Sequence, residues 1–111
     1  MNKKLQFLST LIFFIGCSKV TNEETLIEKS SVTYSKGSSV PFTGEVIGKY
    51  DSGQERIKGK YIDGKREGLW IFLHKNGKES EKGEYSNGSK KGDWSKWYEN
   101  GILKSRGTYS N

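Results

Sequence analysis

Short runs in which apolar and polar residues alternate fill the second half of the chain, and glycines separate these runs. Alternation with a period of two is typical of strands that bury one face. It predicts six strands, at residues 45–50, 57–62, 69–74, 79–85, 93–98 and 102–109. Short consecutive strands joined by glycine turns indicate an antiparallel meander of β-hairpins, so we expect an all-β fold built as one elongated sheet.

Two kinds of connection join these strands. Residues 76–77 and 100–101 are Asn-Gly, which predicts tight hairpin turns, because a type I′ turn needs positive φ at both central residues. Longer connections are expected over residues 63–68 and 87–92, where Asp-Gly or Asn-Gly opens the segment and a second glycine closes it.

A 24-residue period underlies this order. When residues 59–82 are laid over residues 83–106, seven positions are identical: Gly59/Gly83, Tyr61/Tyr85, Gly64/Gly88, Gly68/Gly92, Trp70/Trp94, Asn76/Asn100 and Gly77/Gly101. Every identity is a glycine, an aromatic residue or a turn asparagine, as expected when turns and ring packing are fixed while the solvent face varies. Residues 35–43 have lost the pattern, so we expect residues 40–111 to be the repeat domain, with an atypical first unit as its cap.

Each repeat places a glycine two residues before a tyrosine, as in Gly83 and Tyr85. Such a glycine leaves room for a ring from a neighbouring strand, and Trp70 and Trp94 are the expected occupants. The alternative is that the glycines only mark bulges. Trp97 is three residues after Trp94 and is therefore expected on the opposite face of the sheet.

The repeat resembles the MORN-repeat-variant family, whose units combine a tyrosine, paired glycines, a Gly-x-Trp and a later aromatic residue and glycine. Residues 61–77 and 85–101 carry these features, with His74 in the place of the later tyrosine in the first of them. Residues 41–44, Pro-Phe-Thr-Gly, resemble the segment that precedes the repeats in exported members. The resemblance covers residues 41–111 and implies the hairpin-repeat fold. Bacterial members are often lipoproteins or exported proteins of unassigned role, and some are labelled antitoxins.

The N-terminus has the pattern of an export signal over residues 1–16. Lys3 and Lys4 precede an apolar run over residues 5–15, which is too short for a bilayer span of ~20 residues. Residues 14–17, Phe-Ile-Gly-Cys, resemble the lipobox of bacterial lipoproteins, which implies lipidation of Cys17 and stable attachment to the membrane. The alternative is an ordinary cleaved signal with an incidental cysteine.

If Cys17 is lipidated, the resemblance implies a protein of the cell envelope, and Ser18 implies the outer membrane in a host with two membranes. Residues 17–39 are rich in Ser, Thr, Glu and Lys without a convincing period, which predicts a flexible polar tether. A first, irregular strand near residues 31–35 is an open alternative.

Composition argues against several functions. The net charge is +6, and Lys3 and Lys4 supply two of these charges, so +4 remains from Cys17 onward, too little to indicate nucleic-acid binding. Cys17 is the only cysteine, which excludes an intrachain disulfide and a cysteine-based metal site. The only histidine, His74, occupies the position of Tyr98 in the next repeat, so a packed aromatic substitute is favoured over a general base. We expect no catalytic residues, metal or cofactor.

Two surfaces are candidates for partner binding, and the first is basic. Lys65 and Arg66 occupy a predicted connection that is equivalent to the one holding Lys90 and Lys91, so the four cations are expected along one edge of the sheet. The alternative is that they are solvated loop charges that discourage pairing at the edge.

The second candidate surface is aromatic and comprises Trp70, Tyr85, Trp94, Trp97, Tyr98 and Tyr109. Exposed clustered rings are typical of protein interfaces, and Trp97 and Tyr98 are the candidate contact residues. The alternative is that the rings constitute the core, since no helix is available to cover the sheet. Residues 69–73 are apolar at positions on both faces, so protection from solvent is expected to peak in the middle of the array.

These features predict a membrane-tethered, non-enzymatic β-repeat module that binds a protein or an envelope surface. The alternative is an antitoxin-like component of a toxin–antitoxin pair, although a lipidated leader argues against an antitoxin that must meet a cytosolic toxin. A glycan-acting enzyme is the least favoured function. The strand at residues 102–109 is expected to offer unpaired backbone groups for strand addition by a partner or a second copy. Whether further repeats follow stays open.

Overall fold

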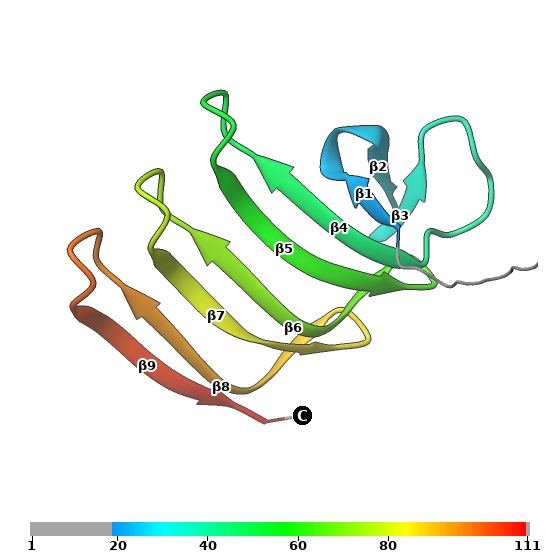
Figure 1. The fold of residues 1–111 in the computed structure, drawn as a ribbon. Coiled ribbons are helices and arrows are strands. Elements are labelled where there is room, and N and C mark those ends of the chain that lie inside the picture. Colours follow the sequence, from blue (N-terminus) through cyan, green and yellow to red (C-terminus); the bar gives the residue numbers. More distant parts are fainter. Residues whose placement is uncertain (1–18, 111) are drawn as a thin grey trace, which may run out of the picture.

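The computed structural model describes residues 19–110, and this part of the chain is a curved seven-stranded sheet with a two-stranded hairpin beside it (Figure 1). The strands are β1 (Val20–Asn22), β2 (Leu26–Lys29), β3 (Val32–Ser35), β4 (Gly44–Lys49), β5 (Glu55–Ile62), β6 (Lys65–Leu73), β7 (Glu79–Ser86), β8 (Ser89–Trp97) and β9 (Leu103–Tyr109). A single 3₁₀ turn, η1 (Glu23–Thr25), follows β1, and no α-helix occurs among the described residues. The large sheet has the order β1-β4-β5-β6-β7-β8-β9.

The expected all-β meander is confirmed. Strands β4 to β9 correspond to the six predicted strands, and each pairs antiparallel with the next. The sheet contains one further strand, β1, which pairs with β4 in parallel. The meander is elongated, with principal extents of 59 × 34 × 30 Å.

The prediction of a flexible tether over residues 17–39 is wrong for its described part, residues 19–39. This segment forms β1, η1 and the β2–β3 hairpin, and β3 corresponds to the strand that the sequence left as an alternative. The hairpin is held by specific contacts rather than by a continuous apolar stripe. Leu26 packs against the core, Glu23 forms an ion pair with Arg56, and the Thr33 amide donates to the carbonyl of Gly64 at 2.9 Å.

The two kinds of turn are exchanged relative to the prediction. Asp63 and Asn87 have φ of 51° and 50° and are followed by glycines at φ of 80° and 91°, so these pairs form the tight two-residue turns. The Asn-Gly pairs lie in longer turns, in which only the glycine has positive φ and the His74 amide donates to the Lys78 carbonyl at 2.8 Å. Gly68 and Gly92, with φ of 72° and 69°, lie inside strands β6 and β8, beside shifts of register, and close no loop.

Strand pairing divides the side chains of the sheet between two faces. The aromatic face carries Val46, Ile57, Tyr61, Trp70, Phe72, Tyr85, Trp94 and Tyr109. The second face carries Ile47, Ile62, Leu69, Ile71, Leu73, Trp97 and Leu103. The core lies on the aromatic face, where Trp70 is completely buried and Trp94 is 3% exposed.

Each buried tryptophan lies flat on a glycine of the preceding strand. Trp70 covers Gly59 and Trp94 covers Gly83 so closely that a Cβ at either glycine would overlap the indole ring. The glycines are therefore required by ring packing, as the 24-residue pattern predicts. Both indole Nε1 groups donate to a backbone carbonyl, Trp70 to Lys60 at 3.1 Å and Trp94 to Glu84 at 3.0 Å.

We expect Gly59→Val to destabilise the protein by about 2–3 kcal/mol, because the added methyl groups must displace the Trp70 ring. The measurement is the free energy of unfolding from urea titration monitored by tryptophan fluorescence. Gly107→Val is the matched control, since no heavy atom of the described residues lies within 4 Å of a Cβ built there. Equal losses for the two variants would contradict the proposed role of Gly59.

Candidate functional site

The candidate lipidation residue, Cys17, and the export signal at residues 1–16 lie outside the described residues. Within residues 19–110, no helix is both long and apolar enough to cross a bilayer.

The four candidate cations do not form one basic loop edge. All four lie within strands, because β6 begins at Lys65 and β8 begins at Ser89. Strand alternation then separates them: Arg66 pairs with Tyr61 and Lys90 pairs with Tyr85 on the aromatic face, whereas Lys65 and Lys91 point to the second face. The prediction that they occupy loops is therefore wrong, and although both pairs lie beside equivalent turns, their division between two faces leaves no single basic surface.

Arg66 is part of the aromatic packing. Its guanidinium lies 4.5 Å from the centroid of Trp70 and 5.3 Å from that of Tyr85, and its Nη1 donates to the Tyr85 hydroxyl at 3.1 Å. Burial lowers the pKa of Arg66, but hydrogen bonds to Tyr61 and Tyr85 more than offset this, so its pKa is raised. Arg66 remains charged at any relevant pH and serves as a half-buried cation over rings.

Lys90 has the same position one repeat later. Its Nζ lies 4.4 Å from the centroid of Trp94 and donates to Glu81 at 3.1 Å. Burial lowers the pKa of Lys90, and the hydrogen bond and charge of Glu81 outweigh it, so the pKa is raised. Thus one repeat neutralises its cation with a carboxylate, while no described carboxylate forms an ion pair with Arg66.

The aromatic candidates also separate into different environments. Trp70 and Trp94 are buried, which supports the alternative that these rings are core. Trp97 lies on the second face, as predicted, and pairs with Leu103. Tyr98 begins the turn between β8 and β9 and is 51% exposed.

The position shared by Tyr50, His74 and Tyr98 has a defined structural role. The Tyr50 hydroxyl donates to the carbonyl of Leu73 at 2.7 Å, and Nε2 of His74 lies 2.9 Å from the carbonyl of Trp97. Each of these side chains therefore links one hairpin tip to the next. His74 replaces tyrosine in this contact, which agrees with its interpretation as a packed substitute. No comparable contact occurs for Tyr98 among the described residues.

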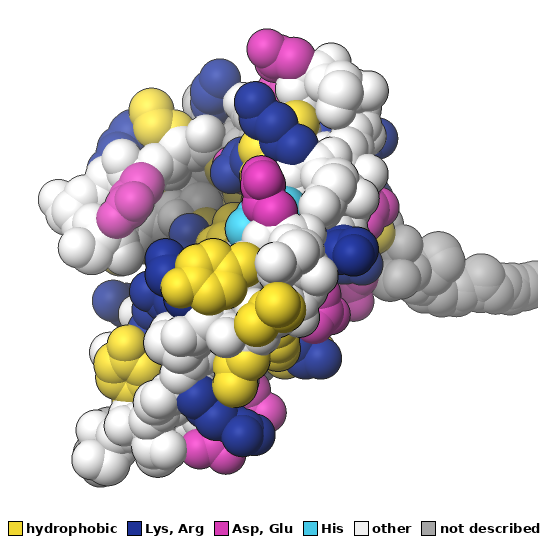
Figure 2. Space-filling model, turned by 90° about the vertical axis from the view of Figure 1, so that its left-hand side faces the viewer, with side chains coloured by type: hydrophobic (Ala, Val, Ile, Leu, Met, Phe, Trp, Pro, Cys, Tyr) yellow, Lys and Arg dark blue, Asp and Glu magenta, His cyan; other side chains and the backbone are white. Residues whose placement is uncertain are grey.

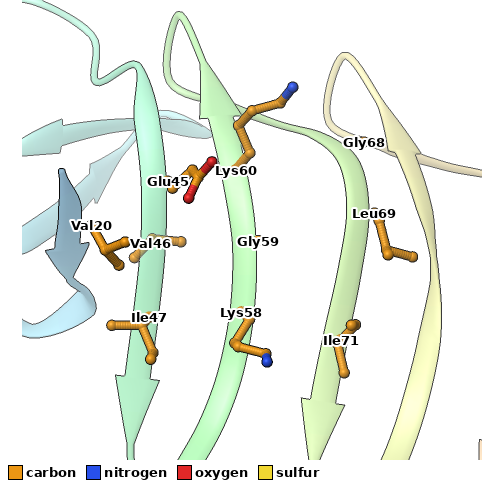
Figure 3. A pocket seen from close by; sticks show the side chains of 10 residues that line it. All are labelled: Val20, Glu45, Val46, Ile47, Lys58, Gly59, Lys60, Gly68, Leu69 and Ile71. Carbon is orange, nitrogen blue, oxygen red and sulfur yellow. The ribbon is translucent and has the colours of Figure 1, made fainter. Parts of the chain in front are cut away.

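The second face contains an open hollow of about 370 Å³ over the middle of the sheet (Figure 3). Gly59 lies at its centre without a side chain, and Trp70 covers the opposite side of the same glycine. Apolar side chains line the hollow, and charges of both signs border it: Val20, Ile47, Leu69 and Ile71 with Glu45, Lys58 and Lys60. A second hollow, of about 300 Å³, continues from Leu69 to Trp97.

Sequence reasoning missed most of this surface. The signal was present in residues 69–73, which are apolar at consecutive positions and so supply both faces. Val20 could not be assigned to it, because the parallel pairing of β1 with β4 depends on contacts distant in sequence.

The described residues contain no group of three or more His, Cys, Asp or Glu side chains placed to hold a metal ion. In comparisons with known proteins, no family model, no curated protein and no solved structure matches this chain. The arrangement of its own side chains is therefore the basis for a functional proposal.

We expect Arg66→Gln to lower the free energy of unfolding by about 1–2 kcal/mol, since it removes a half-buried cation from contact with Trp70 and Tyr85. Lys65→Gln is the matched control on the other face and should change stability by less than ~0.5 kcal/mol. Chemical denaturation of both variants checks this difference. An unchanged free energy of unfolding for Arg66→Gln would instead show that Arg66 is a surface cation that does not contribute to the packing.

Proposed function

We propose that this chain is a non-enzymatic β-repeat module of the MORN-variant type that a lipid on Cys17 holds at the cell envelope, where the module binds another protein. The observation that carries the binding part is the second face of the sheet. Its apolar side chains have no covering layer among the described residues, and Leu69 is 50% and Leu103 48% exposed. Contiguous apolar surface of this kind marks sites of protein interaction in soluble domains.

Two lysines at the centre of this face could pair with carboxylates of a partner. Ile71 pairs with Lys58 on one side and with Lys82 on the other, so lysines flank the apolar strip at Ile71, whereas Leu69 pairs with Glu84. Each of these lysines has only an exposed ion pair with a glutamate three residues earlier, at 3.5 and 3.8 Å. Exposed pairs contribute little stability, so the lysines can exchange them for a partner's carboxylates at low cost.

The anchoring part of the proposal is supported by the lipobox-like residues 14–17. Blocking lipoprotein signal processing with globomycin is expected to shift the protein to a larger apparent mass, and Cys17→Ala should abolish that shift. Both changes are followed by immunoblot of membrane and soluble fractions. A wild-type protein that stays in the soluble fraction and shows no shift would contradict the anchoring.

The binding part is tested by crosslinking in cells with the full-length protein as bait, followed by quantitative mass spectrometry. Leu69→Asp places a charge in the centre of the second face and should reduce the recovery of the specific partner at least tenfold. Val40→Asp is the matched control, because Val40 is 69% exposed and lies outside every strand. Partner recovery that is equal for both variants would contradict binding through this face.

A further inference from the structure

The packing between consecutive hairpins defines a recurring tryptophan site. It consists of a glycine, the carbonyl of the next residue and the ring of the tyrosine that follows, and it occurs in β5 (Gly59, Lys60, Tyr61) and β7 (Gly83, Glu84, Tyr85). In each, the tryptophan from the next strand lies on the glycine, donates its Nε1 proton to the carbonyl, and meets the tyrosine edge-on at 5.2 Å between ring centroids.

Strand β9 carries a third tryptophan site, formed by Gly107, Thr108 and Tyr109. No heavy atom of the described residues lies within 4 Å of a Cβ built at Gly107, whereas the two equivalent glycines lie under an indole ring. Tyr109 is 46% exposed, and every residue of β9 is exposed. In the part of the chain that the structure describes, no strand pairs with the outer edge of β9.

The turn that precedes β9 also lacks a contact that the equivalent turn of the previous repeat makes. Asn76 accepts the amide of Lys78 with its side-chain oxygen and donates its amide group to the carbonyl of Glu99 in the next hairpin, at 2.8 Å. Asn100 repeats the first contact, since it accepts the amide of Ile102 at 3.0 Å, but its amide group has no acceptor among the described residues. Seen from the side on which β9 lies, exposed hydrophobic side chains stand between lysines and arginines (Figure 2).

We propose that the outer edge of β9 binds an extended segment of a partner protein, which adds to the sheet as a further antiparallel strand and places a tryptophan on Gly107. The proposal deepens the proposed function, on which it rests, by naming the chemistry of a bound segment. Strand addition satisfies the free backbone groups of an edge, and a side chain in a fitted position gives the specificity.

The occupied sites define the sequence that fits. In both, the incoming strand has a cation four residues before the tryptophan and a glycine two residues before it: Arg66, Gly68 and Trp70 in β6, and Lys90, Gly92 and Trp94 in β8. The cation pairs with the tyrosine of the site. The residue after the tryptophan pairs with the lysine directly before the glycine of the site, Ile71 with Lys58 and Ser95 with Lys82.

At the β9 site the equivalent of Lys82 is Arg106. A carboxylate directly after the partner's tryptophan would therefore face a guanidinium. The expected segment is an exposed strand of the form basic–x–Gly–x–Trp–acidic. The acidic position agrees with the lysine-bordered second face, which lies on the same side of the sheet as Arg106.

The test uses a fluorescein-labelled peptide with the sequence of residues 87–99, which contains the β8 strand that fills the equivalent site on β7. Its binding to the full-length protein, purified in detergent, is measured by fluorescence anisotropy. We expect saturable binding, and we expect the peptide change Ser95→Glu to increase affinity about threefold and Trp94→Ala to decrease it at least tenfold.

Gly107→Val in the protein should also decrease the affinity at least tenfold, because its side chain fills the tryptophan site while leaving the fold intact. Circular dichroism of this variant verifies folding, and Val40→Asp, at an exposed position outside every strand, should leave peptide affinity unchanged. The crosslinking experiment with Leu69→Asp changes the second face and leaves the edge of β9 intact. A failure of the proposed function can therefore be distinguished from a failure of the strand-addition proposal.

Absence of saturable binding, or equal affinity for the Trp94→Ala peptide, would overturn the proposal. Analytical ultracentrifugation of the protein without peptide measures whether it forms a dimer. A dimer that Gly107→Val dissociates would assign the edge to a second copy of the chain and overturn the proposal of a separate partner.

Discussion

The packing of an indole ring on a strand glycine is the contact on which the rest of the structure depends. No α-helix among residues 19–110 covers this single-layer sheet, and only four of the described hydrophobic residues are buried: Val46, Ile57, Trp70 and Trp94. A tryptophan that buries about 200 Å² contributes on the order of 5 kcal/mol. The glycine makes this burial possible, because any larger residue would lift the ring from the sheet.

The same contact explains the arrangement of the polar groups around it. With the ring flat on the sheet, its N–H reaches a backbone carbonyl and its outer surface is available to a cation from the same strand, Arg66 or Lys90. These cations cover the core in place of a second layer. Among the described residues the other surface of the sheet receives no such cover, and this asymmetry is the basis for the proposal that it binds a partner.

Much of the fold could be predicted from the sequence, because the residues that form the tryptophan–glycine contact recur in each 24-residue repeat. The spacing of Gly83, Tyr85 and Trp94 indicates which ring lies on which strand, and the structure agrees. The turn types could not be assigned, because Asn76-Gly77 and Asn87-Gly88 are the same dipeptide. Their conformations depend on where the pairing of the flanking strands ends. At Asn87 the strands pair up to the residues next to the turn, Ser86 and Ser89, whereas at Asn76 the pairing ends earlier, at Leu73 and Glu79.

The candidate basic residues were misplaced for the same reason. A loop that closed at Gly68 would put Arg66 outside the sheet, whereas a bulge at that glycine continues the strand through Arg66. The even spacing of Arg66 and Trp70 was the signal that both share a face. The strands within residues 20–35 carried no comparable signal, since their few apolar residues gain burial only from the sheet already formed, as Leu26 does against the buried core of that sheet.

A double-mutant cycle at Gly83 and Trp94 tests the central contact most directly. The free energies of unfolding of Gly83→Ala, Trp94→Ala and the double variant are compared with that of the unchanged protein. If the ring is what excludes a Cβ at Gly83, the cost of Gly83→Ala disappears once Trp94 is alanine, with a coupling energy of about 1.5–3 kcal/mol. Additive losses in the double variant would contradict the account.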